Sequence, residues 1–192
     1  MTRRFSILAG VVVAATIATL TVPISRYAVW NTTASVPTGL YAIRGRASLH
    51  VGERVALLPP PDLRHLLAER RYLPAGVPLL KRIAAVQGQR VCRIANGITI
   101  DGQYVGAVLA RDSLGRSLPV WAGCRVLGTG ELFVMNPAAP GSFDGRYFGV
   151  LRDADVIGRA VPIWTDEGGN GDHQWFADPR GSDTSPIKTQ GD

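Results

Sequence analysis

An uncharged apolar run close to the N-terminus constrains this chain more than any other feature. Phe5–Ile24 forms twenty consecutive positions without a charged side chain. At about 1.5 Å rise per helical residue, such a run spans roughly 30 Å, the thickness of a bilayer's hydrocarbon core. A cleavable signal peptide is the alternative, but its apolar region is typically about 7–15 residues long, and no clear small-x-small cleavage site follows Leu20. We therefore expect an uncleaved transmembrane signal anchor over residues 5–24.

The charges that flank this run predict its orientation. Arg3 and Arg4 precede it together with the α-amino group, whereas only Arg26 follows it closely. Because positively charged flanks are retained on the cytoplasmic side of a membrane, residues 1–4 would be cytoplasmic. The rest of the chain would then lie on the other side of the membrane.

The chain beyond the apolar run is rich in residues that form turns. The full chain has 22 glycines and 13 prolines, and nearly all of them lie beyond this run, where they separate short apolar stretches. This pattern is typical of strands joined by turns. One short helix is expected over 62–73, where leucines recur at helical spacing and Asp62 would cap the first turn. Val91–Ile100 and Gln103–Leu109 are predicted to be two strands of a hairpin around Asp101-Gly102. We therefore predict a mainly β domain over residues 25–164. The polar tail that follows, 165–192, is rich in Gly, Asp, Ser and Thr and is expected to be disordered.

The charge balance does not indicate a nucleic-acid partner. A formal net charge of +6 is compatible with nucleic acid, with an anionic membrane surface, or with solubility alone. The sequence contains no run of five basic residues and no helix-turn-helix or zinc-finger spacing. Nucleic acid is therefore not expected among the partners of this protein.

The chain has two cysteines, Cys92 and Cys124. They do not form a C-x-x-C pair, and no histidine lies close enough in the sequence to suggest a zinc site. Neither a metal nor an organic cofactor is indicated. If the domain lies outside the cytoplasm, a disulfide between the two is expected, and two buried free thiols are the alternative.

Ser35 stands in a short rigid turn, and a serine held in this way is a candidate nucleophile. Pro37 fixes its own φ and restricts Val36 before it. Gly39 then lets the backbone bend before a strand that begins at Leu40. Because serine is a weak nucleophile at neutral pH, Ser35 needs a general base.

The three histidines are poor candidates for that base. His65 lies on the polar helix, His173 lies in the predicted tail, and His50 lies in a turn. None of these settings would order an imidazole beside a serine, so a histidine triad is not expected.

Lys81 is the better candidate for the base. The period of a strand places it on one apolar face with Leu79, Ile83 and Ala85. Burial disfavours the ammonium form and lowers the pKa of a lysine, and a neutral amine can accept the serine proton. The alternative is an edge-strand lysine whose amine reaches water.

Three segments that carry these residues stand in an informative order. After the apolar run come Ser35 in SVPTGLY, Lys81 in LLKRIAAVQGQRV, and a Ser-x-Asp-x-Arg segment in SFDGRYFG. This order resembles the type I signal peptidase family of membrane-bound Ser–Lys proteases, over roughly Phe5 to Trp164. The similarity is greatest to the conjugative-transfer branch, which processes pilin precursors. The resemblance implies a protein anchored in a bacterial inner membrane. Its catalytic domain would have the β-rich signal-peptidase fold and lie in the periplasm.

The resemblance also implies a role for each matching residue. Ser35 would be the nucleophile and Lys81 the general base. The backbone N–H of Ser35 and the hydroxyl of Thr33 would bind the oxyanion. The supporting residues would be Ser142, which orients the lysine amine, and the ion pair of Asp144 and Arg146.

The chain departs from the ordinary bacterial members at three places. Ser35-Val36-Pro37 is one residue shorter than their Ser-Met-x-Pro, a spacing that it shares with the conjugative branch, as it does the stretch YLPAGVPLLKR. The loop Asn136–Gly141 lacks the family's Gly-Asp-Asn, which puts in doubt any supporting contact from that loop. Gly145 replaces the usual serine.

The sequence thus predicts a membrane-bound serine endopeptidase without a cofactor. Its substrate would be a pilin precursor or another membrane-presented precursor, and its partners the lipid bilayer and components of conjugation or type IV secretion. A general type I signal peptidase is the alternative within the same chemistry. A non-catalytic, membrane-anchored assembly module is the alternative from another class.

Overall fold

The computed structural model of the protein describes residues 7, 10–11, 28–46 and 48–180. The expected membrane anchor, Phe5–Ile24, therefore lies outside the described residues at all but three positions, and residues 1–4 and 181–192 lie outside them entirely. Among the residues that are described, no helix combines the length and the hydropathy needed to cross a bilayer.

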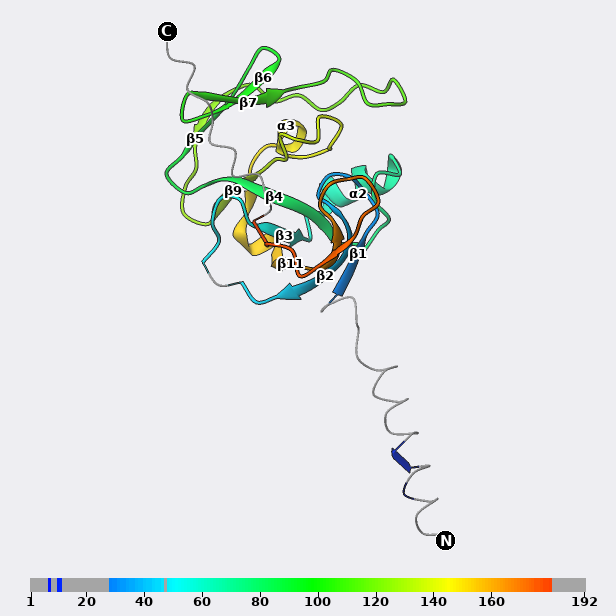
Figure 1. Ribbon diagram of the computed structural model, residues 1–192. Coiled ribbons are helices and arrows are strands. Elements are labelled where there is room, and N and C mark those ends of the chain that lie inside the picture. Colours follow the sequence, from blue (N-terminus) through cyan, green and yellow to red (C-terminus); the bar gives the residue numbers. More distant parts are fainter. Residues whose placement is uncertain (1–6, 8–9, 12–27, 47, 181–192) are drawn as a thin grey trace.

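Two antiparallel sheets make up the described domain (Figure 1), which confirms the predicted mainly β class. In the larger sheet, hydrogen-bonded neighbours follow the order β1-β2-β11-β3-β4-β9-β10. A further strand, β12, pairs with β11. The smaller sheet has the order β7-β6-β5-β8. The strands of the larger sheet are β1 (Ala28–Asn31), β2 (Thr38–Arg44), β3 (Arg54–Leu57), β4 (Leu79–Val86), β9 (Glu131–Val134), β10 (Leu151–Arg152), β11 (Val156–Asp166) and β12 (Gln174–Trp175).

Strand β4 lies inside the larger sheet between β3 and β9. From Lys81 onward its residues alternate between buried and half-buried, and Lys81, Ile83 and Ala85 are the buried ones. Lys81 is paired with Val55 of β3. The predicted strand and its buried face are therefore confirmed, and the lysine lies on that face rather than at an edge.

The smaller sheet consists of β5 (Arg90–Ile94), β6 (Gly97–Ile100), β7 (Gln103–Ala107) and β8 (Gly123–Val126). The predicted turn at Asp101-Gly102 joins β6 to β7, and both residues have positive φ, 51° and 84°. The stretch expected to be one strand, 91–100, is instead two strands, β5 and β6, which pair around a turn at Ala95 and Asn96. The sequence carries a hairpin signal here, Asn96-Gly97, which the interpretation as one strand overlooked.

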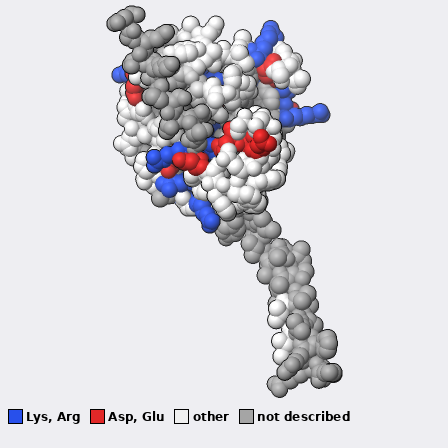
Figure 2. Space-filling view, viewed as in Figure 1, with Lys and Arg blue, Asp and Glu red and all other residues white. Residues whose placement is uncertain are grey.

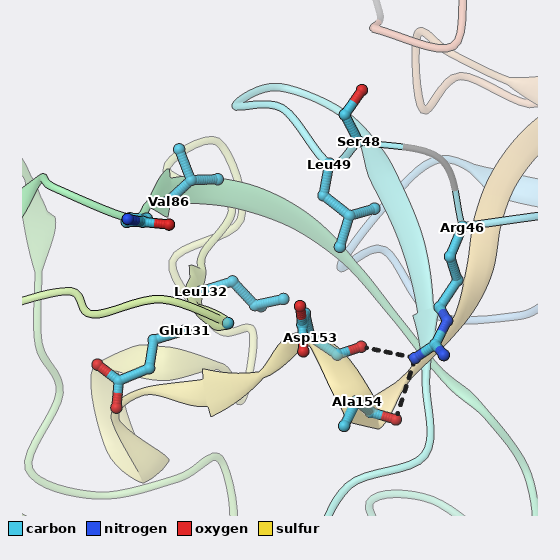
Figure 3. Close-up of a pocket in the computed structure, with 10 residues that line it drawn as sticks. Arg46, Ser48, Leu49, Val86, Glu131, Leu132, Asp153 and Ala154 are labelled. Atoms are coloured by element: carbon cyan, nitrogen blue, oxygen red, sulfur yellow. Dashed lines mark hydrogen bonds between the residues drawn. The ribbon is translucent and has the colours of Figure 1, made fainter.

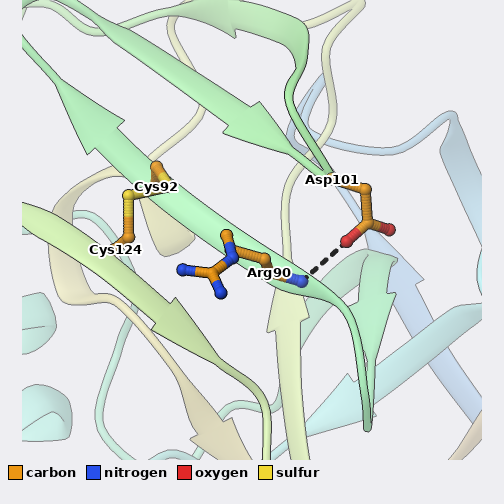
Figure 4. The surroundings of a disulfide bond; sticks show 4 residues. All are labelled: Arg90, Cys92, Asp101 and Cys124. Atoms are coloured by element: carbon orange, nitrogen blue, oxygen red, sulfur yellow. Dashed lines mark hydrogen bonds between the residues drawn. A yellow bond between two sulfur atoms is a disulfide. The ribbon is translucent and has the colours of Figure 1, made fainter.

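A disulfide joins Cys92 of β5 to Cys124 of β8 (Figure 4). The two residues are directly opposite each other in the pairing of these strands. Close by, Arg90 N–H donates to Asp101 Oδ1 at 2.7 Å, which fastens the β6–β7 turn back onto β5. Of the two states that the sequence left open for the cysteines, the structure has the disulfide.

Between residues 28 and 180 the described chain has two short α-helices, whereas one short helix was predicted there. Helix α2 (Pro61–Glu69) begins with a proline, so Asp62 lies in the first turn and does not cap it; proline is favoured there because its missing N–H would have no partner. Helix α3 (Gly145–Phe148) was missed. The Asp144 carboxylate caps it by accepting a hydrogen bond from Arg146 N–H at 3.2 Å. A single 3-10 turn, η2 (Asp153–Asp155), precedes β11.

The residues just after 164 are folded, which corrects the predicted start of the tail. Strand β11 continues through Asp166, and Thr165 pairs with Gln174 of β12. Glu167 accepts two hydrogen bonds, of 2.8 and 2.5 Å, from the guanidinium of the buried Arg54. A buried charge needs such a partner, so the polar composition of this segment reflects specific contacts. For residues 181–192 disorder remains a prediction.

Charged side chains of both signs are interspersed on the face shown in Figure 2, and they do not gather there into one basic patch. Three ion pairs of the described surface illustrate this mixing: Arg116 with Asp112, Arg159 with Glu53, and Arg125 with Glu131. This face therefore has no continuous basic surface, although the formal net charge of the full chain is +6.

Candidate active site

The serine turn connects β1 to β2 and comprises residues 32–37. Val36 is 1% exposed and anchors the turn in an apolar cluster. Tyr41 donates from its hydroxyl to the oxygen of Pro37 at 2.7 Å, and burial raises the pKa of this tyrosine well above its usual value, so the hydroxyl keeps its proton. The turn is thus fastened on its C-terminal side, while Ser35 itself is half-buried.

Gly39 is required where β2 begins. Its φ is 130°, and a Cβ at this position would lie 2.2 Å from the oxygen of Trp164 on the neighbouring strand. Only glycine tolerates both this conformation and this approach. Gly39, which the sequence predicted only as a bend, therefore allows β2 to approach β11 closely just after the serine turn.

The hydroxyl of Ser35 has two oxygen neighbours. Its Oγ lies 3.1 Å from Thr33 Oγ1 and 3.5 Å from the main-chain oxygen of Leu80. Leu80 precedes Lys81 on β4, so the turn and the lysine strand meet at this contact. Among the described residues, no hydrogen bond joins Ser35 Oγ to Lys81 Nζ directly. The two side chains must therefore come closer before they can exchange a proton.

Lys81 is 2% exposed and its ammonium group points into the domain. Nζ donates to Ser142 Oγ at 2.7 Å. Burial lowers the pKa of Lys81 from 10.5 to about 8, with Asp144 acting in the opposite direction and Arg146 in the same direction. A lysine with this pKa is neutral in a useful fraction of molecules near neutral pH, as a general base requires.

Asp144 and Arg146 form a fully buried ion pair beside the lysine. Arg146 Nε donates to Asp144 Oδ1 and Nη2 to Oδ2, both at 2.8 Å, and the two side chains are 0% and 1% exposed. Arg146 Nη2 also donates to the oxygen of Ala139 at 2.6 Å. The pair therefore holds the loop before Ser142 as well as the start of α3.

Gly145 lies where a side chain has no room. A Cβ there would come within 2.6 Å of Phe133 Cε2 and 2.7 Å of the Val134 oxygen. The departure from the family's serine at this position thus has a steric cause in this protein.

Two asparagines that sequence reasoning missed contact the serine turn. Asn31 bonds to several of its main-chain groups, and Asn136 Nδ2 donates to the oxygen of Ser35 at 2.8 Å. Asn136 belongs to the loop Asn136–Gly141, for which the missing Gly-Asp-Asn had put a supporting contact in doubt. The contact with Ser35 shows that this doubt was wrong. Each asparagine accepts from the N–H two residues ahead, Thr33 and Ala138. Asparagine favours such Asx-turns, which is a local signal for the two turns but not for the contact of Asn136 with Ser35.

The histidines have other surroundings among the described residues. His50 and His65 are exposed and lie 3.8 and 3.9 Å from Glu53 and Glu69. His173 stacks on Trp164, with 4.3 Å between ring centroids. None of the three is hydrogen-bonded to Ser35.

A cavity of about 450 Å³ lies elsewhere on the domain (Figure 3). Arg46 lies at one side of it and donates to the main-chain oxygens of Asp153 and Ala154. Neither Ser35 nor Lys81 lines this cavity, so it does not belong to the candidate active site.

A sequence model of the family described as signal peptidase, peptidase S26, matches residues 2–165 of the chain. Among solved structures, the crystal structure of a signal peptidase I from Enterococcus faecalis is similar at 19% sequence identity. The match covers 59% of this chain and 97% of that chain, with a TM-score of 0.35. No curated protein sequence matches the chain. The family model carries the assignment: this chain belongs to the signal peptidase family, peptidase S26, whose members are serine endopeptidases of the signal peptidase type.

Proposed function

We propose that this protein cleaves precursor proteins with a Ser–Lys dyad made of Ser35 and Lys81. The observation that carries the proposal is the buried amine of Lys81, which has a pKa of about 8 and lies one residue from the main-chain oxygen that Ser35 contacts. Few roles other than proton transfer explain a lysine that is 2% exposed and has no direct carboxylate partner among the described residues.

The reaction would begin with attack of Ser35 Oγ on the scissile carbonyl, while neutral Lys81 accepts the serine proton. The ammonium then gives that proton to the leaving amine, and an acyl-enzyme remains. In the second half, Lys81 accepts a proton from a water molecule that attacks the ester. A substrate amine could take the place of that water, which would join two peptide ends.

The oxyanion would be bound by Ser35 N–H and by the Thr33 hydroxyl. Thr33 Oγ1 donates to Asn31 Oδ1 at 3.1 Å in the structure. A hydroxyl has one proton, so Thr33 must turn from Asn31 toward the substrate when the tetrahedral intermediate forms. Loss of one such donor typically costs on the order of 10²–10³ in rate.

The substrate class follows first from the family, because signal peptidases act on preproteins. Within it we favour a pilin precursor processed for conjugative transfer. The support for this finer proposal is the short Ser35-Val36-Pro37 spacing and the stretch YLPAGVPLLKR before the lysine. The protein would be anchored by Phe5–Ile24 in the bacterial inner membrane, with its catalytic domain in the periplasm, where precursor cleavage sites emerge.

A general signal peptidase remains the second candidate, favoured by the family match itself. Expression in cells depleted of their own signal peptidase separates the two. Rescue of bulk secretion would overturn the dedicated pilin substrate, whereas processing of the pilin precursor without such rescue supports it.

The dyad is tested by precursor processing with Ser35→Ala and Lys81→Arg. The arginine keeps the charge but cannot supply a neutral base. Both variants should lose processing, whereas Ser113→Ala, at an exposed serine, and Lys188→Arg, at the chain's other lysine, should retain it. Full processing by both Ser35→Ala and Lys81→Arg would overturn the protease and favour an assembly module.

A further inference from the structure

Every hydrogen bond from the Asn31 side chain to a described residue stays within the serine turn. Nδ2 donates to the main-chain oxygens of Thr33, Val36 and Pro37, at 2.8, 2.9 and 3.0 Å. Oδ1 accepts from the N–H of Thr33 at 3.2 Å and from its hydroxyl at 3.1 Å. Asn31 is the last residue of β1 and is 7% exposed. One buried amide therefore connects both ends of the turn, with Ser35 between them.

Asn136 holds the same turn from a different part of the fold. Its Nδ2 donates to the oxygen of Ser35 at 2.8 Å, and the residue is 8% exposed. The main chain of Asn136 is itself tied to the buried ion pair, because its N–H donates to Asp144 Oδ2 at 3.4 Å and its oxygen accepts from Arg146 Nη2 at 3.5 Å. The ion pair beside Lys81 is thus connected to Ser35 through a single residue.

These contacts restrict the peptide groups on both sides of Ser35. Asn136 fixes the carbonyl of Ser35, and Asn31 fixes the carbonyls of Thr33 and Val36. Without the amides, those oxygens would bond to water, and the turn could sample other backbone conformations. A displacement of about 1 Å at a reacting group can cost roughly 10²-fold in rate, so the turn's position has direct consequences for attack.

We propose that Asn31 and Asn136 are positioning residues that together hold Ser35 against the lysine strand. The inference rests on the proposed function, since it gives these amides a role in the reaction of Ser35. It assigns no contact with substrate to either of them.

The two functional groups of the Asn31 amide can be separated. Asn31→Asp keeps an acceptor for Thr33 but replaces the donor with a second acceptor that faces three carbonyl oxygens. Asn31→Ala removes both groups. Asn136→Ala removes the donor to Ser35 and leaves the main-chain contacts to the ion pair. The matched control is Asn96, an exposed residue in the β5–β6 turn, changed to Asp and to Ala.

The experiment measures kcat and KM of the full-length variants in detergent, on the precursor that the wild type cleaves. The temperature is one at which circular dichroism shows each variant to be folded. For Asn31→Asp, Asn31→Ala and Asn136→Ala we expect kcat to fall by a factor of about 10 or more, with KM within about threefold of wild type. The pH midpoint of kcat/KM should stay at the wild-type value, because the neighbours of Lys81 are unchanged.

A purely structural role gives a different result. It would lower the melting temperature but leave kcat of the folded enzyme within tenfold of wild type, and that outcome overturns the inference. If the Asn31 variants do not fold, Asn136→Ala decides alone by the same criterion. If Ser35→Ala still processes the precursor, the proposed function fails instead. If Ser35→Ala is inactive but the asparagine variants keep the kcat of the wild type, only the positioning role is rejected and the proposed function stands.

Discussion

Lys81 Nζ and Ser142 Oγ lie 2.7 Å apart, and both side chains are buried, at 2% and 7% exposure. Ser142 precedes α3, whereas Lys81 belongs to β4, so the contact joins two parts of the fold that are 61 residues apart in the sequence. The lysine amine is thereby held in one direction inside the domain, beside the buried pair of Asp144 and Arg146. This arrangement has consequences for activity and for stability.

Removal of the Ser142 hydroxyl should weaken the proposed base. Ser142→Ala leaves the amine without its hydrogen-bond acceptor, so we expect kcat/KM to fall by about 10–100-fold, part of the 10²–10⁴ that general base catalysis typically contributes. Steady-state kinetics on the precursor measures this, with Ser113→Ala as the control. A kcat/KM within threefold of wild type would show that the hydroxyl does not orient the base.

Replacement of Lys81 by an apolar side chain should stabilise the domain near neutral pH. The folded-state pKa of about 8 lies below the value of 10.5 for an exposed lysine, so the unfolded state binds more protons between these pH values and stability rises with pH there. Below pH 8 Lys81 is charged in the folded state, so the full free-energy cost of burying its ammonium group reduces the stability. Lys81→Met should therefore raise the free energy of unfolding by about 1–3 kcal/mol at pH 7.

Urea unfolding at pH 7 and again at high pH checks this prediction. The advantage of Lys81→Met should shrink between pH 8 and 10.5, where the wild type sheds its penalty. Lys188→Met serves as the control. A variant that is less stable than wild type at pH 7 would contradict the expected cost of the buried ammonium.

Restoring the family's serine at position 145 should destabilise this protein. The new Cβ would lie 2.6 Å from Phe133 Cε2 and 2.7 Å from the oxygen of Val134, so Gly145→Ser should lower the free energy of unfolding by about 1–3 kcal/mol. Gly141→Ser is the matched control, because a Cβ at position 141 would meet no atom within 4 Å beyond its own chain neighbours. Equal stabilities of the two variants in urea would refute the steric explanation.

Loss of the disulfide should reduce stability by an amount set mainly by the loop it closes. Cys92 and Cys124 are 32 residues apart, which corresponds to roughly 3–4 kcal/mol in the chain-entropy model. Thermal or urea unfolding of the Cys92→Ser/Cys124→Ser variant, compared with the oxidised wild type, measures this. A loss below about 1 kcal/mol would mean that the reduced, unfolded chain is already constrained.

Local patterns predicted the elements whose signal is contained in a few neighbouring residues. The alternation around Lys81, the Asp101-Gly102 turn and the serine turn at Pro37 are of this kind, because each depends on side-chain periodicity or on backbone restriction. The order of the motifs along the chain added the candidate partners of Ser35.

Long-range contacts could not be predicted in the same way. The segment after Trp164 has the composition of a disordered tail, and what orders it is the pairing with β11 and the bidentate contact of Glu167 with Arg54. Asn136 was missed for a similar reason, since its partner Ser35 lies 101 residues away. Composition carries no information on such partners.

The pH dependence of kcat/KM for the wild-type enzyme tests the central claim, that neutral Lys81 activates Ser35, most directly. kcat/KM reports the ionisation of the free enzyme, so with a pKa of about 8 for Lys81 it should rise tenfold per pH unit below 8 and level off above it. At pH 6 it should be about one hundredth of the plateau. A profile that is flat from pH 6 to pH 9, on a substrate that does not titrate there, would contradict the account.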